Sequence, residues 1–415
     1  MAALIRDRDW SASPLGSIDG WPQSLRTALS IVLASRFPMA LWWGPELTQF
    51  YNDGYRPVLG ALKHPASLGQ RAQECWAEIW DVIGPMARDV LTTGEATWSA
   101  DLLLVMERNG YVEETYFTFS YSAIRDESGG ISGMLITCTE TTERVLAERR
   151  LQVLRDLAAR LADCSTVDET VETAMAVLAE SPEVAKDVLF AALHLRDGAR
   201  ARCAGRVRLA ASAPACPEEV ELAASGAEPI ARVVESGRAE VVEVDERFGP
   251  LESGAWPERP RIAVILPVAK PGESRGYGAL TVGVSPRRAL DPEYRSFLDL
   301  LARQIATGVT AAEAHEAERR RAEELAELDR AKTRFFSNAS HELRTPLTLI
   351  LGPLADALDG RFGPTPAALT EALAMTERNA QRLRKLVDTL LDFTRLEEGR
   401  ARVRAEETDV SALTR

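Results

Sequence analysis

The chain has 415 residues, of which 46% are hydrophobic and 27% charged, and its formal net charge is -13. This length is too great for one core, so about two to four domains are expected, and the composition excludes a largely disordered chain. The negative charge argues against nucleic acid as the main partner, because a phosphate backbone would be repelled.

The sequence holds no apolar run long enough to span a bilayer as a helix. The two best candidates are Thr27 to Trp43, which is broken by Arg36 and Pro38, and Ile262 to Ala269, which is far too short. The N-terminus also lacks the continuous apolar core of a signal peptide. We therefore expect a cytoplasmic protein that does not enter a membrane.

The cysteines indicate the same compartment. Their number is odd and no Cys-x-x-Cys pair occurs, which argues against a zinc site and a disulfide framework and fits a reducing cytoplasm. No metal site is predicted. The five cysteines are Cys75, Cys138, Cys164, Cys203 and Cys216.

Residues from about 30 to 140 carry short runs typical of β-strands. Three of them, Ala100 to Met106, Glu114 to Tyr121 and Gly133 to Thr139, are separated by turn-forming residues. A helical stretch, Trp76 to Leu91, precedes them. Residues 1–29 are interpreted as an N-terminal extension.

This segment resembles a PAS domain. The resemblance lies in Phe50 to Tyr55 (Phe-Tyr-Asn-Asp-Gly-Tyr), in Gly94-Glu95 before the strands, and in a closing Thr-Glu-Thr-Thr-Glu-Arg at 139–144. It implies a five-stranded antiparallel sheet with flanking helices over residues 30–142.

A connecting helix is predicted over residues 143–162. Its apolar residues recur at steps of four, three, four and three, which is the spacing of a coiled-coil seam. Two heptads do not establish a coiled coil alone, but the seam fits a connector in a dimeric sensor. The seam residues are Ala147, Leu151, Leu154, Ala158 and Leu161.

Residues 163–312 combine a helix, several strand-like runs and a closing helix. The closing helix begins with Asp291-Pro292, an N-cap residue followed by a proline at the first helical position. This order resembles a GAF domain. The helix covers Val167 to Ala179, and the strands cover Leu189 to Leu195, Glu240 to Val244, Ile262 to Val268 and Gly278 to Val284.

Residues 313–402 predict a helical hairpin. The stretch 313–334 holds thirteen charges of nearly balanced sign but keeps an apolar edge, so we expect a continuous helix through it. That helix should stop near Asp359-Gly360, with Thr365 capping the next helix and Pro366 opening it. Two such helices cannot bury their apolar faces alone, whereas two hairpins can form a dimeric four-helix bundle.

The first helix of this hairpin contains the run Ser340 to Leu347 (Ser-His-Glu-Leu-Arg-Thr-Pro-Leu). Apolar residues around it recur at helical spacing and form one stripe. At about 100° per residue, His341 points about 140° away from the mean direction of that stripe, and Thr345 lies about 40° from His341. The imidazole is therefore expected to be exposed. The stripe consists of Leu343, Leu347, Ile350, Leu354 and Leu358.

The run resembles the phosphoacceptor box of sensor histidine kinases of two-component systems. A neutral imidazole is nucleophilic near neutral pH, so His341 is the predicted phosphoacceptor. The resemblance implies that Glu342 is the general base and that Thr345 orients water when a bound response regulator is dephosphorylated. Arg344 either contacts phosphate or is an ordinary helix charge, and both interpretations stay open. Pro346 removes a backbone donor, so the helix should bend or soften there.

The Asn-rich and Gly-rich boxes of the family's ATP-binding domain do not occur in the sequence. Taken together, the three segments predict a multidomain α+β fold: a PAS-like sheet domain, a GAF-like sensor domain and the helical hairpin. Residues 403–415 would begin a linker to an absent ATP-binding domain. ATP and Mg would act through that domain, and the chain would be truncated before it.

The function implied is a histidine kinase that autophosphorylates on His341 and passes the phosphoryl group to an Asp of a response regulator receiver domain. The expected assembly is a homodimer. Two alternatives stay open: a phosphoacceptor and phosphatase scaffold without kinase activity, and a ligand-binding sensor module with an inert box. An unidentified small molecule is a candidate ligand of either sensor domain. No cofactor is assigned, because single histidines such as His64 and His194 are usually structural.

Overall fold

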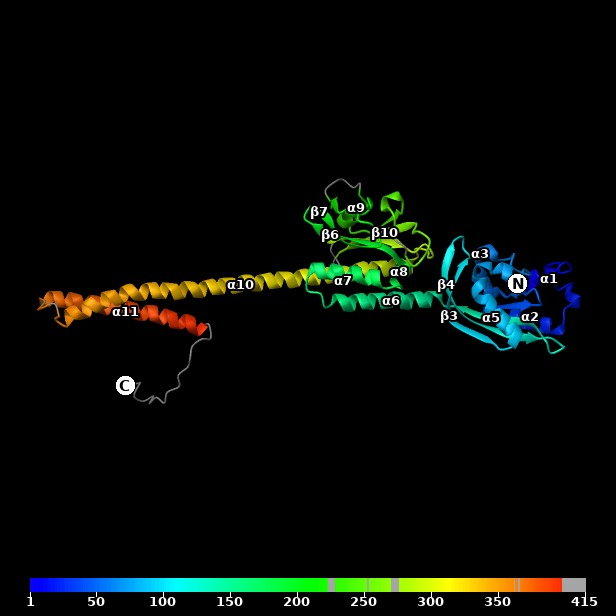
Figure 1. Ribbon diagram of the computed structural model, residues 1–415, viewed down its shortest axis with the longest axis horizontal. Helices are drawn as coiled ribbons and strands as arrows, with labels where there is room; N and C mark the ends of the chain where they lie inside the picture. The colour runs from blue at the N-terminus through cyan, green and yellow to red at the C-terminus, as the bar shows by residue number, and fades with distance from the viewer. Residues whose placement is uncertain (223–227, 252–253, 270–275, 362, 365, 398–415) are drawn as a thin grey trace, which may run out of the picture. The chain divides into compact units, whose positions relative to one another are not determined.

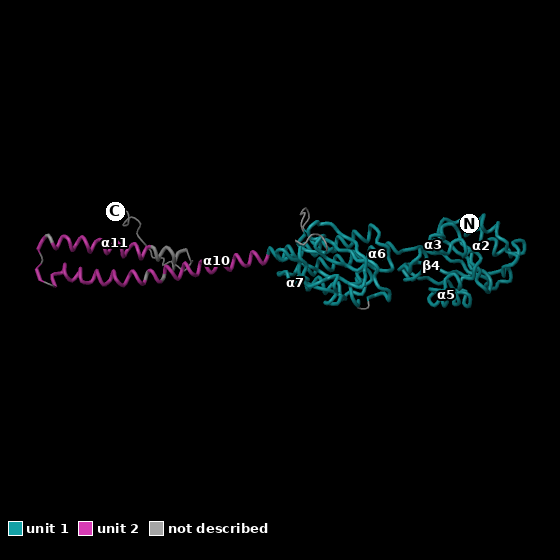
Figure 2. The backbone as a smooth tube through the Cα atoms, turned by 90° about the horizontal axis from the view of Figure 1, so that it is seen from above, with its two compact units in different colours: residues 1–314 teal, residues 315–415 magenta. Residues whose placement is uncertain are grey.

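The computed structural model describes residues 1–222, 228–251, 254–269, 276–361, 363–364 and 366–397. The chain divides into two compact units, Met1–Ala314 and His315–Arg415, which Figure 2 distinguishes by colour. The predicted Thr365 cap and the predicted linker 403–415 lie outside the described residues.

The first unit begins with a five-stranded sheet in which every neighbouring pair is antiparallel, as the PAS resemblance implied. The strand order is β2-β1-β5-β4-β3. The strands are β1 (Met39–Trp43), β2 (Thr48–Tyr51), β3 (Thr97–Glu107), β4 (Val112–Arg125) and β5 (Ile131–Glu140). Its helices are α1 (Ala2–Asp7), α2 (Gln23–Ala34), α3 (Arg56–Lys63), α4 (Ala72–Cys75) and α5 (Trp80–Thr93). Short 3-10 turns cover Ile18–Gly20, Asp53–Tyr55 and Ala77–Ile79.

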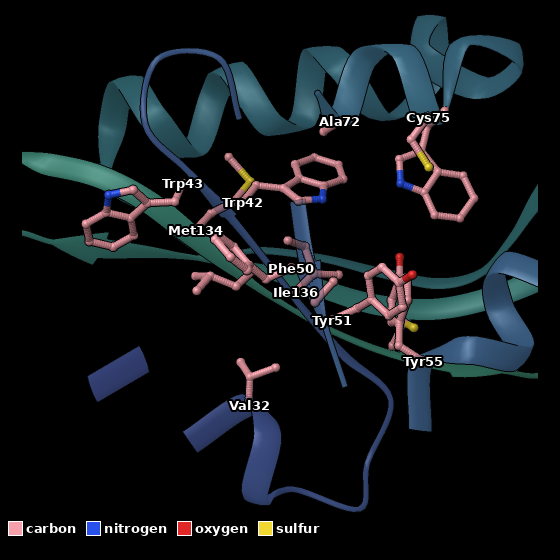
Figure 3. Packing of buried hydrophobic residues seen from close by; sticks show 14 of the residues in the cluster. Val32, Trp42, Trp43, Phe50, Tyr51, Tyr55, Ala72, Cys75, Met134 and Ile136 are labelled. Carbon is pink, nitrogen blue, oxygen red and sulfur yellow. The ribbon is translucent and has the colours of Figure 1, made fainter. Parts of the chain in front are cut away.

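The core of this PAS-like domain is rich in aromatic residues on both faces of the sheet. In Figure 3, Val32 of α2 lies on one side of the strands, and Ala72 and Cys75 of α4 lie on the other. On the α4 side, buried Gln49 accepts hydrogen bonds from the indole nitrogens of Trp42 and Trp76, at 3.0 and 2.8 Å.

The opposite face of the sheet packs against the first thirty residues of the chain. Phe50 stacks on Trp10, with ring centroids 5.1 Å apart, and meets Trp21 edge-on at 5.4 Å. Leu25 of α2 belongs to the same core. The predicted N-terminal extension thus contributes side chains to the PAS-like core.

Helix α6 (Thr142–Leu161) leads into a six-stranded antiparallel sheet of order β8-β7-β6-β11-β10-β9. The strands are β6 (Val188–Asp197), β7 (Arg200–Val207), β8 (Glu219–Glu221), β9 (Glu240–Glu243), β10 (Ile262–Val268) and β11 (Gly278–Val284). The helices are α7 (Val167–Glu180), α8 (Val184–Asp187) and α9 (Pro229–Ser236), with a 3-10 turn at Glu246–Phe248 (Figure 1).

Alternation along these strands divides the buried residues of this GAF-like domain between two faces. Leu193, Leu280 and Val282 share one core with residues of α6, α7 and the start of α10. Ala279, from the other face, packs with α9, and Phe190 packs with Phe248. The sheet is therefore covered by helices on both faces, by α6, α7 and the start of α10 on one and by α9 on the other.

Two long helices complete the described chain. Helix α10 covers Pro292–Leu358 and α11 covers Ala367–Glu397. The carboxylate of Asp291 accepts a hydrogen bond from the amide of Tyr294 at 2.8 Å, which is the predicted N-cap geometry. After α10, Gly360 has a φ of 78°, the left-handed conformation in which glycine commonly ends a helix. None of the described helices is both long and apolar enough to cross a membrane.

Candidate functional site

The predicted phosphoacceptor run lies in the second unit, on the part of α10 that pairs with α11. Leu347 and Leu351 are buried, with 6% and 9% of their surface exposed, as are Ala380 and Val387 of α11. Leu343 and Ile350 belong to the same predicted stripe as Leu347 but remain 49% and 48% exposed. One hairpin therefore buries only part of its apolar surface.

His341 is exposed on α10, as its angular position predicted. The hydroxyl of Thr345 donates a hydrogen bond to the main-chain oxygen of His341 at 3.2 Å, so the two residues lie on adjoining turns of one helix face. Exposure leaves the imidazole open to a reactant.

Glu342 is exposed beside His341. Consecutive residues on a helix do not face each other, and within the described part of the chain no hydrogen bond joins the Glu342 carboxylate to the His341 ring. The general-base role of Glu342 stays a prediction.

Arg344 forms an ion pair with Asp388, which joins α10 to α11. Its guanidinium nitrogen lies 3.0 Å from the Asp388 carboxylate, and both side chains are 45% exposed. An exposed pair of this kind contributes only about 0–1 kcal/mol. The Arg344 side chain is therefore held by α11 but can be released at low cost, so both predicted roles stay open.

Asp388 is a residue of the site that the sequence reasoning missed. Arg344 and Asp388 are 44 residues apart in sequence and lie on different helices of the hairpin. Pairing them requires the register of α11 against α10, which no local sequence signal gives.

Helix α10 continues through Pro346 and Pro353. Pro346 has no amide hydrogen, so it cannot donate to the carbonyl oxygen of Glu342 four residues earlier. One backbone hydrogen bond is thus missing next to the candidate site. The predicted softening of the helix at Pro346 stays a prediction.

Two cavities of the PAS-like domain differ in size and lining. One is an open cleft of about 1210 Å³, lined by polar residues that include Asp53, Arg56, His64, Arg108 and Glu140. The other lies between the sheet and the helices and has a volume of about 30 Å³. The inner cavity is close to the volume of one water molecule, because large side chains fill the core.

The two histidines of the sensor domains have protein partners. The Nδ1 atom of His64 lies 3.0 Å from the Tyr51 hydroxyl. His194 is buried, its Nε2 donates to the carbonyl oxygen of Pro217 at 2.8 Å, and burial lowers its pKa. Within the described residues no three His, Cys, Asp or Glu side chains are grouped to hold a metal ion.

Residues 331–399 match the His Kinase A (phospho-acceptor) domain family. The chain is 40% identical over 93 residues to the sensor histidine kinase TmoS of Ectopseudomonas mendocina, which covers 22% of this chain and 10% of that protein. It is 46% identical over 78 residues to the hybrid signal transduction histidine kinase D of Dictyostelium discoideum, covering 19% and 5% respectively. The chain thus matches a tenth or less of the length of these relatives.

The first unit also has similar solved structures. One is the GAF domain from Acinetobacter phosphoenolpyruvate-protein phosphotransferase, with 18% sequence identity and a TM-score of 0.29. That similarity covers 40% of this chain and 94% of the other chain.

Proposed function

We propose that this chain, in which residues 331–399 form a His Kinase A phosphoacceptor domain, is the sensor and phosphoacceptor part of a two-component histidine kinase. The observation that carries the proposal is the exposed imidazole of His341 inside the matched residues. The ATP that supplies the phosphoryl group would bind, with Mg, to a domain outside the 415 residues, because the sequence holds none of the family's nucleotide-binding boxes.

In the first step, the unprotonated ring nitrogen of His341 attacks the γ-phosphorus of ATP. A nitrogen–phosphorus bond forms, the bond to the ADP oxygen breaks, and ADP leaves. The proton on the other ring nitrogen passes to Glu342, which acts as general base. Phosphoryl transfer depends mainly on positioning and on charge stabilisation, and Arg344 can supply charge if it leaves Asp388.

In the second step, an Asp carboxylate of a response regulator receiver domain attacks the same phosphorus. The nitrogen–phosphorus bond breaks and His341 is regenerated. When the protein acts as a phosphatase on the phosphorylated regulator, Thr345 would orient the water that hydrolyses the regulator's acyl phosphate.

The working assembly is a homodimer through the hairpin. Leu343 and Ile350 of α10 and Leu383 and Leu386 of α11 are large apolar residues that one chain leaves exposed. A second hairpin would cover them in a four-helix bundle, as these faces require. The ligand of the sensor domains stays unassigned in this proposal.

The proposal is tested by labelling the chain in the presence of a complete kinase of the family and ATP labelled at the γ-phosphate. One residue should carry label, in a bond that is acid-labile and alkali-stable, as a phosphoramidate is. His341→Gln should abolish the label, because glutamine keeps hydrogen bonding but lacks a nucleophilic nitrogen. Glu342→Gln should slow labelling by about 10²–10⁴-fold, as is typical for the loss of a general base.

The matched control is His315→Gln, since His315 is an exposed histidine on the same helix and in the same unit. It should leave labelling unchanged. Thr345→Ala should retain labelling and impair only regulator dephosphorylation. Acid-labile label that persists in the His341→Gln protein would overturn the assignment.

A further inference from the structure

A buried ionic cluster lies at the junction of the PAS-like domain, α6 and the GAF-like domain, within the first unit. We call it the ionic joint, and it comprises Glu114 of β4, Arg149 and Arg150 of α6, and Asp187 of α8. The Arg149 guanidinium is its centre. It lies 2.6 Å from the Glu114 carboxylate and 2.8 Å from the Asp187 carboxylate.

Each carboxylate of the joint has a further donor. Glu114 accepts from the Tyr116 hydroxyl at 2.8 Å, and Asp187 accepts from Arg150 at 2.9 Å. The two arginines balance the two acids in charge. Burial lowers the pKa of Arg149, but Asp187 and Glu114 raise it more strongly, so the net shift is upward and the guanidinium stays charged.

The joint is almost completely shielded from solvent. The exposed fractions of the side chains are 0% for Glu114, 5% for Arg149, 2% for Asp187 and 9% for Arg150. Charges that are this deeply buried are tolerated only when they are paired and hydrogen-bonded. Separating the two domains would therefore expose or orphan four charges at once.

A main-chain bond crosses the same junction. The amide of Glu114 donates to the carbonyl oxygen of Arg287 at 3.1 Å. Arg287 is itself held in the GAF-like domain by two hydrogen bonds of 3.0 Å to Glu258, and it lies over the Trp256 ring at 4.3 Å. The PAS-like strand β4 is thus tied to the GAF-like domain both through side chains and through its backbone.

The joint also reaches the first turn of α10, the helix that carries His341. The Tyr294 hydroxyl donates to the carbonyl oxygen of Asp187. The Arg150 guanidinium lies 4.2 Å from the centre of the Tyr294 ring. Tyr294 is fully buried, and its hydroxyl accepts from the amide of Ser285 at 3.1 Å.

We propose that the ionic joint makes the PAS-like domain, the GAF-like domain and the first turn of α10 one cooperative unit. A perturbation of the PAS-like core then reaches α8 and the start of α10 through Arg149 and Arg150. The two domains act as one sensor with one output, because the joint is either fully paired or fully open to water. A half-open joint would leave a buried charge without its partner.

The test is native-state hydrogen exchange of the full chain, read peptide by peptide. Ile136→Ala creates a cavity in the PAS-like core, since Ile136 is buried in β5. As the only substitution, Ile136→Ala should speed exchange by at least about ten-fold in the PAS-like strands. It should have an effect of the same size in residues 184–190 and 292–301. With Glu114→Gln also present, the increase in the last two segments should be less than about two-fold.

The matched control is Glu113→Gln, at the neighbouring residue. Glu113 is also buried and pairs with an arginine, Arg108, at 2.9 Å, but this pair lies wholly within the PAS-like domain. Glu113→Gln should weaken that domain and leave the transmission of the Ile136→Ala effect intact. If Glu114→Gln does not fold, Arg149→Lys replaces it, because lysine keeps the charge but cannot bridge two carboxylates as a guanidinium does.

Two outcomes would overturn the proposal. One is an Ile136→Ala effect that still reaches residues 292–301 when Glu114 or Arg149 has been replaced. The other is a loss of transmission in the Glu113→Gln control of the same size as in Glu114→Gln. Because every measurement is made on the sensor unit without phosphorylation, the result does not depend on the proposed kinase function.

Discussion

The four histidines of the chain show how local surroundings assign a role to one side-chain type. His341 and His315 are exposed on α10. His64 and His194 have protein partners in the sensor domains. Only His341 combines exposure with a neighbouring acid and a hydroxyl one helical turn away. The sequence alone predicted that difference, because helical spacing decides which residues share a face.

His194 should make the GAF-like domain sensitive to mild acid. Burial lowers its pKa below the usual 6.5, and the nearby Arg206 lowers it further, while the bond to Pro217 and the Glu218 carboxylate raise it. The unfolded chain therefore binds a proton more readily than the folded chain. The associated stability is present above about pH 6.5 and is lost as the pH falls through the lowered folded pKa.

The measurement is denaturant unfolding at a series of pH values between about 7 and 5. His194→Gln keeps a donor for Pro217 but cannot titrate, so its free energy of unfolding should fall less steeply, by at most about 1.4 kcal/mol per pH unit. His64 titrates in both proteins and cancels in the comparison. An equal slope in His194→Gln would contradict the prediction.

Among the elements, α11 offers the most direct test of the proposed four-helix bundle. Leu383 follows Ala380 by three residues and precedes Val387 by four, so the three share one face of the helix, yet Leu383 is 51% exposed in one chain. A partner hairpin would bury it. Leu383→Asp should weaken dimerisation by about 10²–10⁴-fold, since burying an unpaired charge costs about 3–5 kcal/mol.

The dissociation constant of the dimer would be measured by analytical ultracentrifugation. Gln381→Asp is the control, because at about 100° per residue this position faces about 160° away from Leu383 and the same charge stays in water. It should leave the dimer intact. If the Leu383→Asp protein had the same dissociation constant as the parent chain, the face of α11 that holds Leu383 would not be an interface.

The elements that the sequence predicted best are those with continuous apolar runs and clear boundaries. The strands β10 and β11 have the predicted bounds, and α10 begins at Pro292 beside the predicted Asp291 cap. The end of α10 at Leu358 is also confirmed. In each case a local signal, such as a cap, a glycine or an apolar run, decides the boundary.

The elements that were missed lack such a signal. In sequence, the run Thr27 to Trp43 is one broken apolar stretch, although in the structure it contains the end of α2 and the whole of β1. The side chains of strand β7 alternate in burial, but its charged residues and Gly205 hide that alternation in the sequence. Glu114, Arg149 and Asp187 could not be paired from sequence, because they are joined across 35 to 38 residues by tertiary folding alone.

At the scale of the whole molecule, the two compact units should unfold in separate transitions with different concentration dependence. Under the proposed dimerisation, the hairpin unit gains stability by association, so its transition should shift to higher temperature as protein concentration rises. The transition of the sensor unit should shift much less. Scanning calorimetry over about a hundred-fold range of concentration would measure both.

The hairpin transition is identified by the Leu383→Asp protein, in which it should move to lower temperature and lose its concentration dependence. The sensor transition should be unaffected by that substitution. A hairpin transition that stays fixed over the whole range in the parent chain would contradict a dimer held together by this unit.

The aromatic core of the PAS-like domain has a spectroscopic consequence. Seven of the eight tryptophans lie in residues 1–98, the eighth is Trp256 in the GAF-like domain, and residues 315–415 contain none. Intrinsic fluorescence therefore reports on the sensor unit while the hairpin is silent. Trp98, which is 71% exposed, should be quenched by iodide ahead of buried Trp10 and Trp42. In a Trp256→Phe protein, any change in emission on adding a candidate ligand would come from the PAS-like domain alone.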